Sequence, residues 1–133
     1  MLKRIRHIGV IVPEFDRAVK RFKGFGLSCS EVMEVQKLGA KIAFFSIGDT
    51  MIELITHPRP NEGADTMVNV VRDQAGAINH ICFEVDDLEQ TIKDFERNGA
   101  KVVVGCPREG AHGRIAFLRP ETTEGVLIEL CEV

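Results

Sequence analysis

The sequence predicts an α+β fold in which two tandem βαβββ modules form one cup-shaped mixed sheet. Three observations support this prediction. The chain has 133 residues, enough to bury roughly two thirds of its unfolded surface but too few for separate substrate and cofactor domains. The stretch that starts at Ile5 repeats at Ile78, with a histidine at the third position of both copies. After each copy, the hydrophobic spacing changes from a strand period to a helix period and back.

The repeat includes histidine, glycine and glutamate landmarks, which makes chance similarity a poor explanation. The matched pairs are His7 with His80, Phe22 with Phe95, Gly26 with Gly99, 43–45 with 116–118, and 52–54 with 128–130. The last pair is three residues further apart than the others, and the extra residues fall in the proline- and glycine-bearing stretch 119–125, where an insertion is tolerated. We therefore expect a single domain over 1–133, with module 1 at about 1–57, a linker at about 58–77 and module 2 at about 78–133.

The first module is expected to open with a strand that begins at His7. A helix follows, because apolar residues recur every three or four positions on one face, and glycines then stop it. The apolar face consists of Phe15, Ala18, Val19 and Phe22, and the glycines are Gly24 and Gly26. Three strands are predicted next, near 28–35, 41–46 and 51–56.

The second module follows the same order, after a linker that has the pattern of a short helix at 64–72. A strand is expected to begin at His80, and a helix with Leu88, Ile92 and Phe95 on its apolar face ends at Gly99. Three strands are then predicted near 101–104, 114–118 and 126–131.

Strand alternation places four polar residues on the face away from the helices, because successive side chains point to opposite sides of a sheet. The apolar neighbours of His7 and His80 should meet the helices, which leaves the two imidazoles on the opposite face. By the same argument, Glu53 and Glu129 oppose the apolar residues on either side of them. If the sheet curls into a cup, all four side chains converge inside it.

Two imidazoles and two carboxylates in one cavity form an N₂O₂ ligand set for one divalent ion, such as Zn, Co, Ni, Mn or Fe(II). An ion would also offset the repulsion between two buried carboxylates. The alternative is that the histidines only cap the starts of their strands and that the glutamates lie on solvent-facing sheet edges.

Composition and charge exclude several other classes. The net charge of −3 argues against a nucleic-acid partner, and no apolar run approaches the roughly 20 residues of a membrane span. The apolar stretch 8–12 after the basic start is too short for a signal peptide, so we expect a cytoplasmic protein. No two of the four cysteines have C-x-x-C spacing, and Cys82 and Cys131 are interpreted as small buried residues.

The chain resembles the vicinal oxygen chelate superfamily, which includes glyoxalase I, bleomycin resistance proteins and extradiol dioxygenases, over essentially its whole length. Within that superfamily it is most similar to the methylmalonyl-CoA epimerase branch. The segments that carry this similarity are 47–54, 79–88 and 107–132, above all the Gly-Ala-His-Gly loop at 110–113 and the Gly-Val-Leu-Ile-Glu-Leu ending at 125–130.

The resemblance implies a metal-dependent epimerase that removes the proton alpha to the thioester carbonyl of an acyl-CoA and acts as a homodimer. It implies His7, Glu53, His80 and Glu129 as metal ligands, with Glu129 also an acid–base group. The second acid–base glutamate of the family aligns with Lys37, so Glu34 is the candidate for that role. Expected substrate-binding residues are Arg108 and His112, in a candidate lid at 105–113, and Arg119, which stands where epimerases commonly have histidine.

Two other functions stay open at this point. A glyoxalase I-like lyase (lactoylglutathione lyase) would isomerise the adduct of a thiol and a 2-oxoaldehyde and would need only one strong base. A metal-free small-molecule binding protein of the same fold would line its cup with aromatic residues, although this chain has no Trp and no Tyr.

Overall fold

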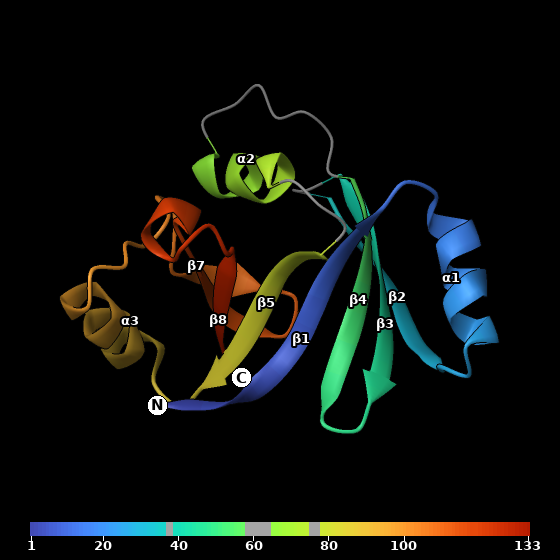
Figure 1. Ribbon diagram of the computed structural model, residues 1–133, viewed down its shortest axis with the longest axis horizontal. Coiled ribbons are helices and arrows are strands. Elements are labelled where there is room, and N and C mark those ends of the chain that lie inside the picture. Colours follow the sequence, from blue (N-terminus) through green and yellow to red (C-terminus); the bar gives the residue numbers. More distant parts are fainter. Residues whose placement is uncertain (37–38, 58–64, 75–77) are drawn as a thin grey trace.

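The computed structural model describes residues 1–36, 39–57, 65–74 and 78–133, and these residues form one continuous eight-stranded mixed sheet (Figure 1). The first module contains β1 (Leu2–Val12), α1 (Phe15–Gly24), β2 (Cys29–Val35), β3 (Ala40–Ile47) and β4 (Thr50–Thr56). The second contains β5 (Ile78–Val85), α3 (Leu88–Arg97), β6 (Arg108–Gly110), β7 (Gly113–Leu118), a 3₁₀ turn η1 (Pro120–Thr122) and β8 (Ile128–Glu132). The predicted fold class is confirmed.

The strand order, β2-β3-β4-β1-β5-β8-β7-β6, follows from the duplication. Within each module the first strand pairs in parallel with the last one, β1 with β4 and β5 with β8. The two modules join where β1 pairs with β5 in antiparallel orientation. The two first strands therefore lie side by side at the centre of the sheet, where the histidines of both repeats are brought together.

Helices α1 and α3 cover the outer face, at opposite ends of the molecule in Figure 1. Phe15, Val19 and Phe22 of α1 pack against a cluster that includes Phe45 and Leu54 of the sheet. Helix α3 buries its apolar face against a cluster that includes Val85 and Leu130. The apolar faces predicted for both helices are thus confirmed, and the burial of apolar surface fixes which side of each strand faces outward.

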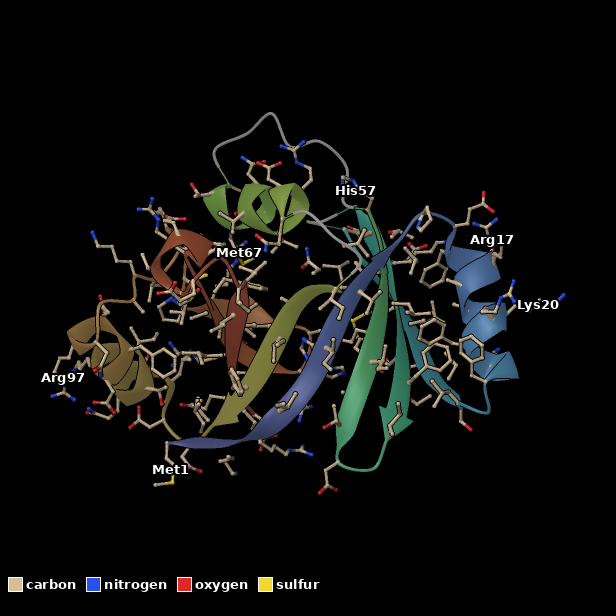
Figure 2. The ribbon with its side chains drawn as sticks, in the orientation of Figure 1. Met1, Arg17, Lys20, His57, Met67 and Arg97 are labelled. Atoms are coloured by element: carbon tan, nitrogen blue, oxygen red, sulfur yellow. The ribbon has the colours of Figure 1, made fainter. Side chains whose placement is uncertain are left out.

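The concave face is lined by a different set of residues. In module 1, Ile42, Phe44 and Ile55 form a buried cluster on this face. Near module 2, helix α2 (Thr66–Asp73) packs Met67 and other residues against Phe117 and Leu127. Figure 2 shows Met67 on the side of α2 that faces the sheet, whereas Arg17 and Lys20 of α1 point away from it. The predicted linker helix is confirmed over 66–72, and its expected first residues lie partly outside the described ones.

The predicted strand at 101–104 is wrong. Of these residues, Val102 makes only an isolated bridge to Leu118, and Val103 is instead buried in the cluster under α2. The second strand of the module is β6, inside the segment that was expected to be a loop. Val103 is thus buried in irregular chain whereas Val104 is exposed, because burial of a side chain does not require a ladder of hydrogen bonds between neighbouring strands.

Both strands that carry the histidines begin before them. Strand β1 starts at Leu2, because its first residues pair with the end of β5, as Leu2 does with Val85. Strand β5 starts at Ile78. His7 is therefore a central residue of its strand, and the interpretation of the histidines as caps of strand starts does not apply to it. No helix among the described residues is long and apolar enough to cross a membrane.

Candidate active site

The four predicted ligands meet on the concave face of the sheet, each from a different central strand. His7 comes from β1, Glu53 from β4, His80 from β5 and Glu129 from β8, and all four are buried. The pairing explains their convergence, because Gly9 of β1 lies opposite both Glu53 and His80. The outcome is what strand alternation predicts.

Three ligand atoms form a nearly equilateral triangle. His7 Nε2 lies 3.0 Å from His80 Nε2 and 3.0 Å from Glu129 Oε2. The third side, from His80 Nε2 to Glu129 Oε2, is also 3.0 Å. Donor atoms bonded to one ion at about 2.1 Å on perpendicular axes lie about 3.0 Å apart. The residues present therefore fit three adjacent positions around one divalent ion.

Glu53 occupies a different place from the one expected of a fourth ligand. Its Oε2 lies 2.8 Å from His7 Nδ1, the ring nitrogen on the far side from the triangle. A carboxylate in this position receives a hydrogen bond from the imidazole and fixes its tautomer, as is usual for histidines that bind metals. In this structure, Glu53 orients His7, and its predicted role as a direct ligand stays a prediction.

The ring of His80 is held by neighbours that were not predicted to be part of the site. The buried Asn79 places Oδ1 2.7 Å from His80 Nδ1 and donates from Nδ2 to the Val71 carbonyl, at 2.9 Å. A Cβ atom on Gly9 would lie 2.3 Å from His80 Cε1, so only glycine leaves room for the ring. Phe117 contacts the ring edge-to-face, with centroids 5.4 Å apart. The sequence held a signal for these residues: each is adjacent to a predicted ligand in the chain or lies on the same face of the sheet.

The protonation of the cluster follows from its charges. Burial opposes a positive charge on His7, but the Glu129 and Glu53 carboxylates outweigh it and raise the pKa of His7 to about 10. Burial also opposes ionisation of Glu129, but His7 and His80 hold the pKa of that carboxyl well below its usual range. Without metal, a cationic His7 thus compensates for an anionic Glu129 in the interior.

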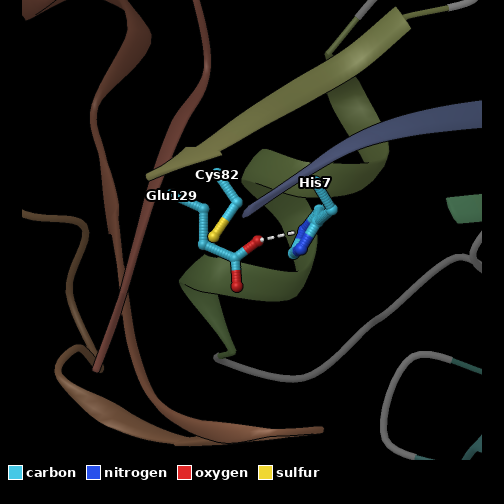
Figure 3. Close-up of side chains that lie close together, drawn as sticks. All are labelled: His7, Cys82 and Glu129. Carbon is cyan, nitrogen blue, oxygen red and sulfur yellow. Dashed lines mark hydrogen bonds and ion pairs between the residues drawn. The ribbon is translucent and has the colours of Figure 1, made fainter. Parts of the chain in front are cut away.

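Cys82 is a further member of the cluster. Its thiol lies within 4.8 Å of ligand atoms of both His7 and Glu129, and Figure 3 shows the three side chains facing one another. A hydrogen bond with the Cys131 thiol, burial and the charge of Glu129 raise the pKa of Cys82. The group is therefore a neutral thiol beside the triangle. Both cysteines are buried as predicted, yet Cys82 shares the row of His80, which was the signal that it faces the site.

The triangle opens into a cavity of about 480 Å³. Apolar side chains form much of its wall, from β3 and β4 on one side and from α2 and β7 on the other. These residues are Ile42, Ile55, Met67, Val68, Val71, Ile115 and Phe117. Walls of this kind exclude water and strengthen electrostatic interactions inside the cavity.

Two of the predicted substrate-binding residues line this cavity. Arg108 is already paired: its Nη1 and Nη2 donate to the two carboxylate oxygens of Asp65, at 2.9 and 3.1 Å. His112, in the turn between β6 and β7, reaches across to module 1. Arg119, the third, is exposed outside the cavity and bonds Glu121, so its expected role in binding substrate finds no support in this placement.

The structure does not bring Glu34 to the triangle. Glu34 borders the cavity and lies opposite Lys41 in the pairing of β2 with β3. Its neighbours Met33 and Val35 pack on the concave face, so Glu34 belongs to the alternate row that faces α1. It also lines a more open hollow of about 610 Å³ beside α1. Its acid–base role stays a prediction, and Lys37 lies outside the described residues.

Comparisons with known proteins agree with this fold. Residues 6–117 match the model of the family described as the Glyoxalase/Bleomycin resistance protein/Dioxygenase superfamily. The chain is 32% identical over 136 residues to an ethylmalonyl-CoA/methylmalonyl-CoA epimerase of Cereibacter sphaeroides, with 100% of both chains covered. It is 31% identical over 133 residues to the mitochondrial methylmalonyl-CoA epimerase of Mus musculus, with 97% of this chain and 72% of the relative covered.

A solved structure of a methylmalonyl-CoA epimerase has the same fold. A variant of the methylmalonyl-CoA epimerase of Streptomyces coelicolor, in complex with 2-nitronate-propionyl-CoA, superposes with a TM-score of 0.82. The sequences are 26% identical, and the match covers 99% of this chain and 95% of the epimerase.

Proposed function

Because the chain belongs to the glyoxalase/bleomycin resistance protein/dioxygenase superfamily, we propose that its site inverts the carbon alpha to the thioester carbonyl of methylmalonyl-CoA or a closely related acyl-CoA. The observation that carries this proposal is the triangle of His7, His80 and Glu129 at the base of an apolar cavity. The relatives named as epimerases of this substrate class support it.

We propose that His7, His80 and Glu129 hold one divalent ion (Co, Ni, Mn, Zn or Fe), with Glu53 as a fourth ligand or as the group that orients His7. When bound, such an ion acts as a Lewis acid that stabilises negative charge on substrate oxygens. His7 must lose its proton for its ring nitrogen to become a ligand, and the Glu53 carboxylate then accepts the hydrogen bond from the other nitrogen.

The chain's own residues supply the rest of the chemistry. The apolar walls keep water away from the enolate that forms when the alpha proton leaves. Glu129 of β8 lines the cavity, and one of its carboxylate oxygens can accept the alpha proton. Asn79 and Gly9 keep the ring of His80 in place during this transfer.

The test loads the purified protein separately with Co(II), Ni(II), Mn(II) and Zn(II) and incubates each form with methylmalonyl-CoA in D₂O. Proton NMR should show metal-dependent loss of the alpha-proton signal, and the isosteric variant Glu129→Gln should lose it. A protein that binds metal without alpha-proton exchange would contradict the epimerase function. It would direct the next assay to the adduct of a thiol and a 2-oxoaldehyde, the substrate of a glyoxalase I-like lyase.

Failure to bind any of these metals would instead favour a metal-free binding protein.

The homodimer stays a prediction, which light scattering of the purified protein tests.

A further inference from the structure

Inversion of a carbon centre requires proton transfer on both of its faces. Under the proposed function, on which this inference rests, Glu129 serves one face. A second group must then reach the cavity from a wall other than β8. Apart from the four predicted ligands, the described cavity-lining side chains that exchange protons are Arg6, Glu34, Arg108, Glu109, His112 and Cys131.

Three of these groups are engaged or lie on the wrong wall. The guanidinium of Arg6 donates to Glu84, at 3.2 Å, and that of Arg108 is held by both oxygens of Asp65. Cys131 is buried on β8, two residues after Glu129, and therefore lies on the wall that Glu129 already serves.

The two remaining carboxylates belong to the outward rows of their strands. Glu34 pairs with Lys41 in the row that faces α1. Glu109 pairs with Arg114, whose guanidinium donates to Glu89 of α3 on the outer side of the sheet. Both glutamates are exposed. Alternation along a strand thus directs both side chains to the face of the sheet opposite the triangle, although both residues border the cavity.

His112 is the group that enters the cavity from a different wall. Its ring contacts Phe44 of β3 edge-to-face, with centroids 5.0 Å apart, and Phe44 belongs to the cluster on the concave face. Its Nε2 lies 3.8 Å from a carboxylate oxygen of Glu31 on β2. The imidazole therefore reaches from β6 and β7 at one end of the sheet to β2 and β3 at the other, with one ring nitrogen toward Glu31.

The backbone fixes this position. Gly110 and Gly113 pair with each other on either side of a two-residue turn that consists of Ala111 and His112. Gly113 has a φ of 143°, and a Cβ atom there would lie 2.3 Å from the Glu132 carbonyl oxygen. Only glycine is compatible with this position, so the hairpin holds His112 over the cavity instead of leaving it on a free loop.

We propose that His112 is the second acid–base residue and exchanges a proton with the alpha carbon on the face opposite to Glu129. The Cα–H bond breaks, its proton passes to the Glu129 carboxylate, and its electron pair delocalises into the thioester enolate. The imidazolium of His112 then donates its proton to the other face, where a new C–H bond forms. Proton exchange with solvent returns Glu129 to the anion and His112 to the cation, so nothing is consumed.

The test follows two processes in the metal-loaded full chain. One stereochemically pure epimer of methylmalonyl-CoA is incubated in D₂O, then the other. Mass spectrometry measures deuterium uptake, and circular dichroism measures inversion. In His112→Asn, inversion should fall by about 100-fold or more, whereas deuterium uptake without inversion should persist for the epimer whose hydrogen faces Glu129. Added imidazole should partly restore inversion in His112→Ala.

The matched control is His57→Asn, because His57 is exposed and does not line the cavity; it should leave both processes unchanged. Inversion within threefold of the wild type in His112→Asn would overturn the proposal. Parallel loss of uptake and inversion for both epimers would also overturn it, since Glu129 should still exchange the alpha proton of one of them. A wild-type protein that shows neither process would refute the proposed function itself, which separates the two failures.

Discussion

At the scale of single residues, the site depends on side chains that hold the predicted ligands in place. Gly9 lies opposite His80 on the concave face. Because Gly9 has no side chain, the imidazole of His80 can occupy the space next to its Cα atom. Asn79 Oδ1 accepts a hydrogen bond from His80 Nδ1, and the Asn79 amide nitrogen donates to the Val71 carbonyl. Such supporting contacts commonly change metal affinity by 10- to 100-fold when they are removed.

Gly9→Ala tests this support. The new Cβ atom would lie 2.3 Å from His80 Cε1, so the ring must move, and we expect unfolding to become easier by about 1–3 kcal/mol with weaker Co(II) binding. Urea denaturation and Co(II) absorption spectra measure the two effects. Gly24→Ala is the control, because a Cβ atom there meets nothing within 4 Å. Equal Co(II) affinity in wild type and Gly9→Ala would contradict this account of Gly9.

At the scale of elements, the ion pair between Arg108 and Asp65 joins the β6–β7 hairpin to the start of α2. Asp65 also accepts a hydrogen bond from the Val68 amide, at 3.4 Å, and thereby caps α2. The Arg108 guanidinium holds the pKa of the Asp65 carboxyl below its usual range. One carboxylate thus begins a helix and positions a strand at the mouth of the cavity.

Arg108→Lys should loosen this junction, because lysine cannot reproduce the two parallel hydrogen bonds of the guanidinium. Both partners are partly exposed, so we expect a loss of at most about 1 kcal/mol in global stability. Hydrogen–deuterium exchange should nevertheless rise severalfold in peptides that cover α2 and β6. Arg114→Lys is the matched control, since Arg114 forms a similar two-bonded pair with Glu89 outside the cavity. Unchanged exchange at α2 in Arg108→Lys would show that the pair does not hold the junction.

At the scale of the whole molecule, the site joins the two modules. His7 and Glu53 belong to the first module, and Glu129 and His80 belong to the second. The imidazole of His7 lies between Glu53, at 2.8 Å, and Glu129, at 3.0 Å. When it is protonated, it therefore forms an ion pair with one carboxylate from each module. The stability of the metal-free protein should therefore depend on the protonation of this one side chain.

The sign of the dependence follows from the pKa of His7, which is about 10 in the folded protein and about 6.5 when unfolded. The stabilisation is complete below pH 6.5 and is lost as the pH rises toward 10, because the folded state then holds one proton more than the unfolded state. The free energy of unfolding should fall by about 1.4 kcal/mol per pH unit in this window. Urea denaturation of chelator-treated protein measures it, and His7→Gln should lack this contribution. Parallel pH profiles for the two proteins would refute the link.

The sequence by itself determined the duplicated βαβββ order, the apolar faces of both long helices and the convergence of His7, Glu53, His80 and Glu129. These features depend on the periodicities of the chain. A period of two places side chains on alternate faces of a strand, and packing of the apolar face against the helices leaves the other face for the cavity.

Only the tertiary structure decided which atoms of these residues meet, because that depends on strand register and on small neighbours from other strands. It placed Glu53 on the far nitrogen of His7, Cys82 beside the triangle, and Glu34 in the row that faces α1. It also turned the segment expected to be a loop into β6. The position of His112 over the cavity depends on contacts between the two ends of the sheet, which no local pattern in the sequence records.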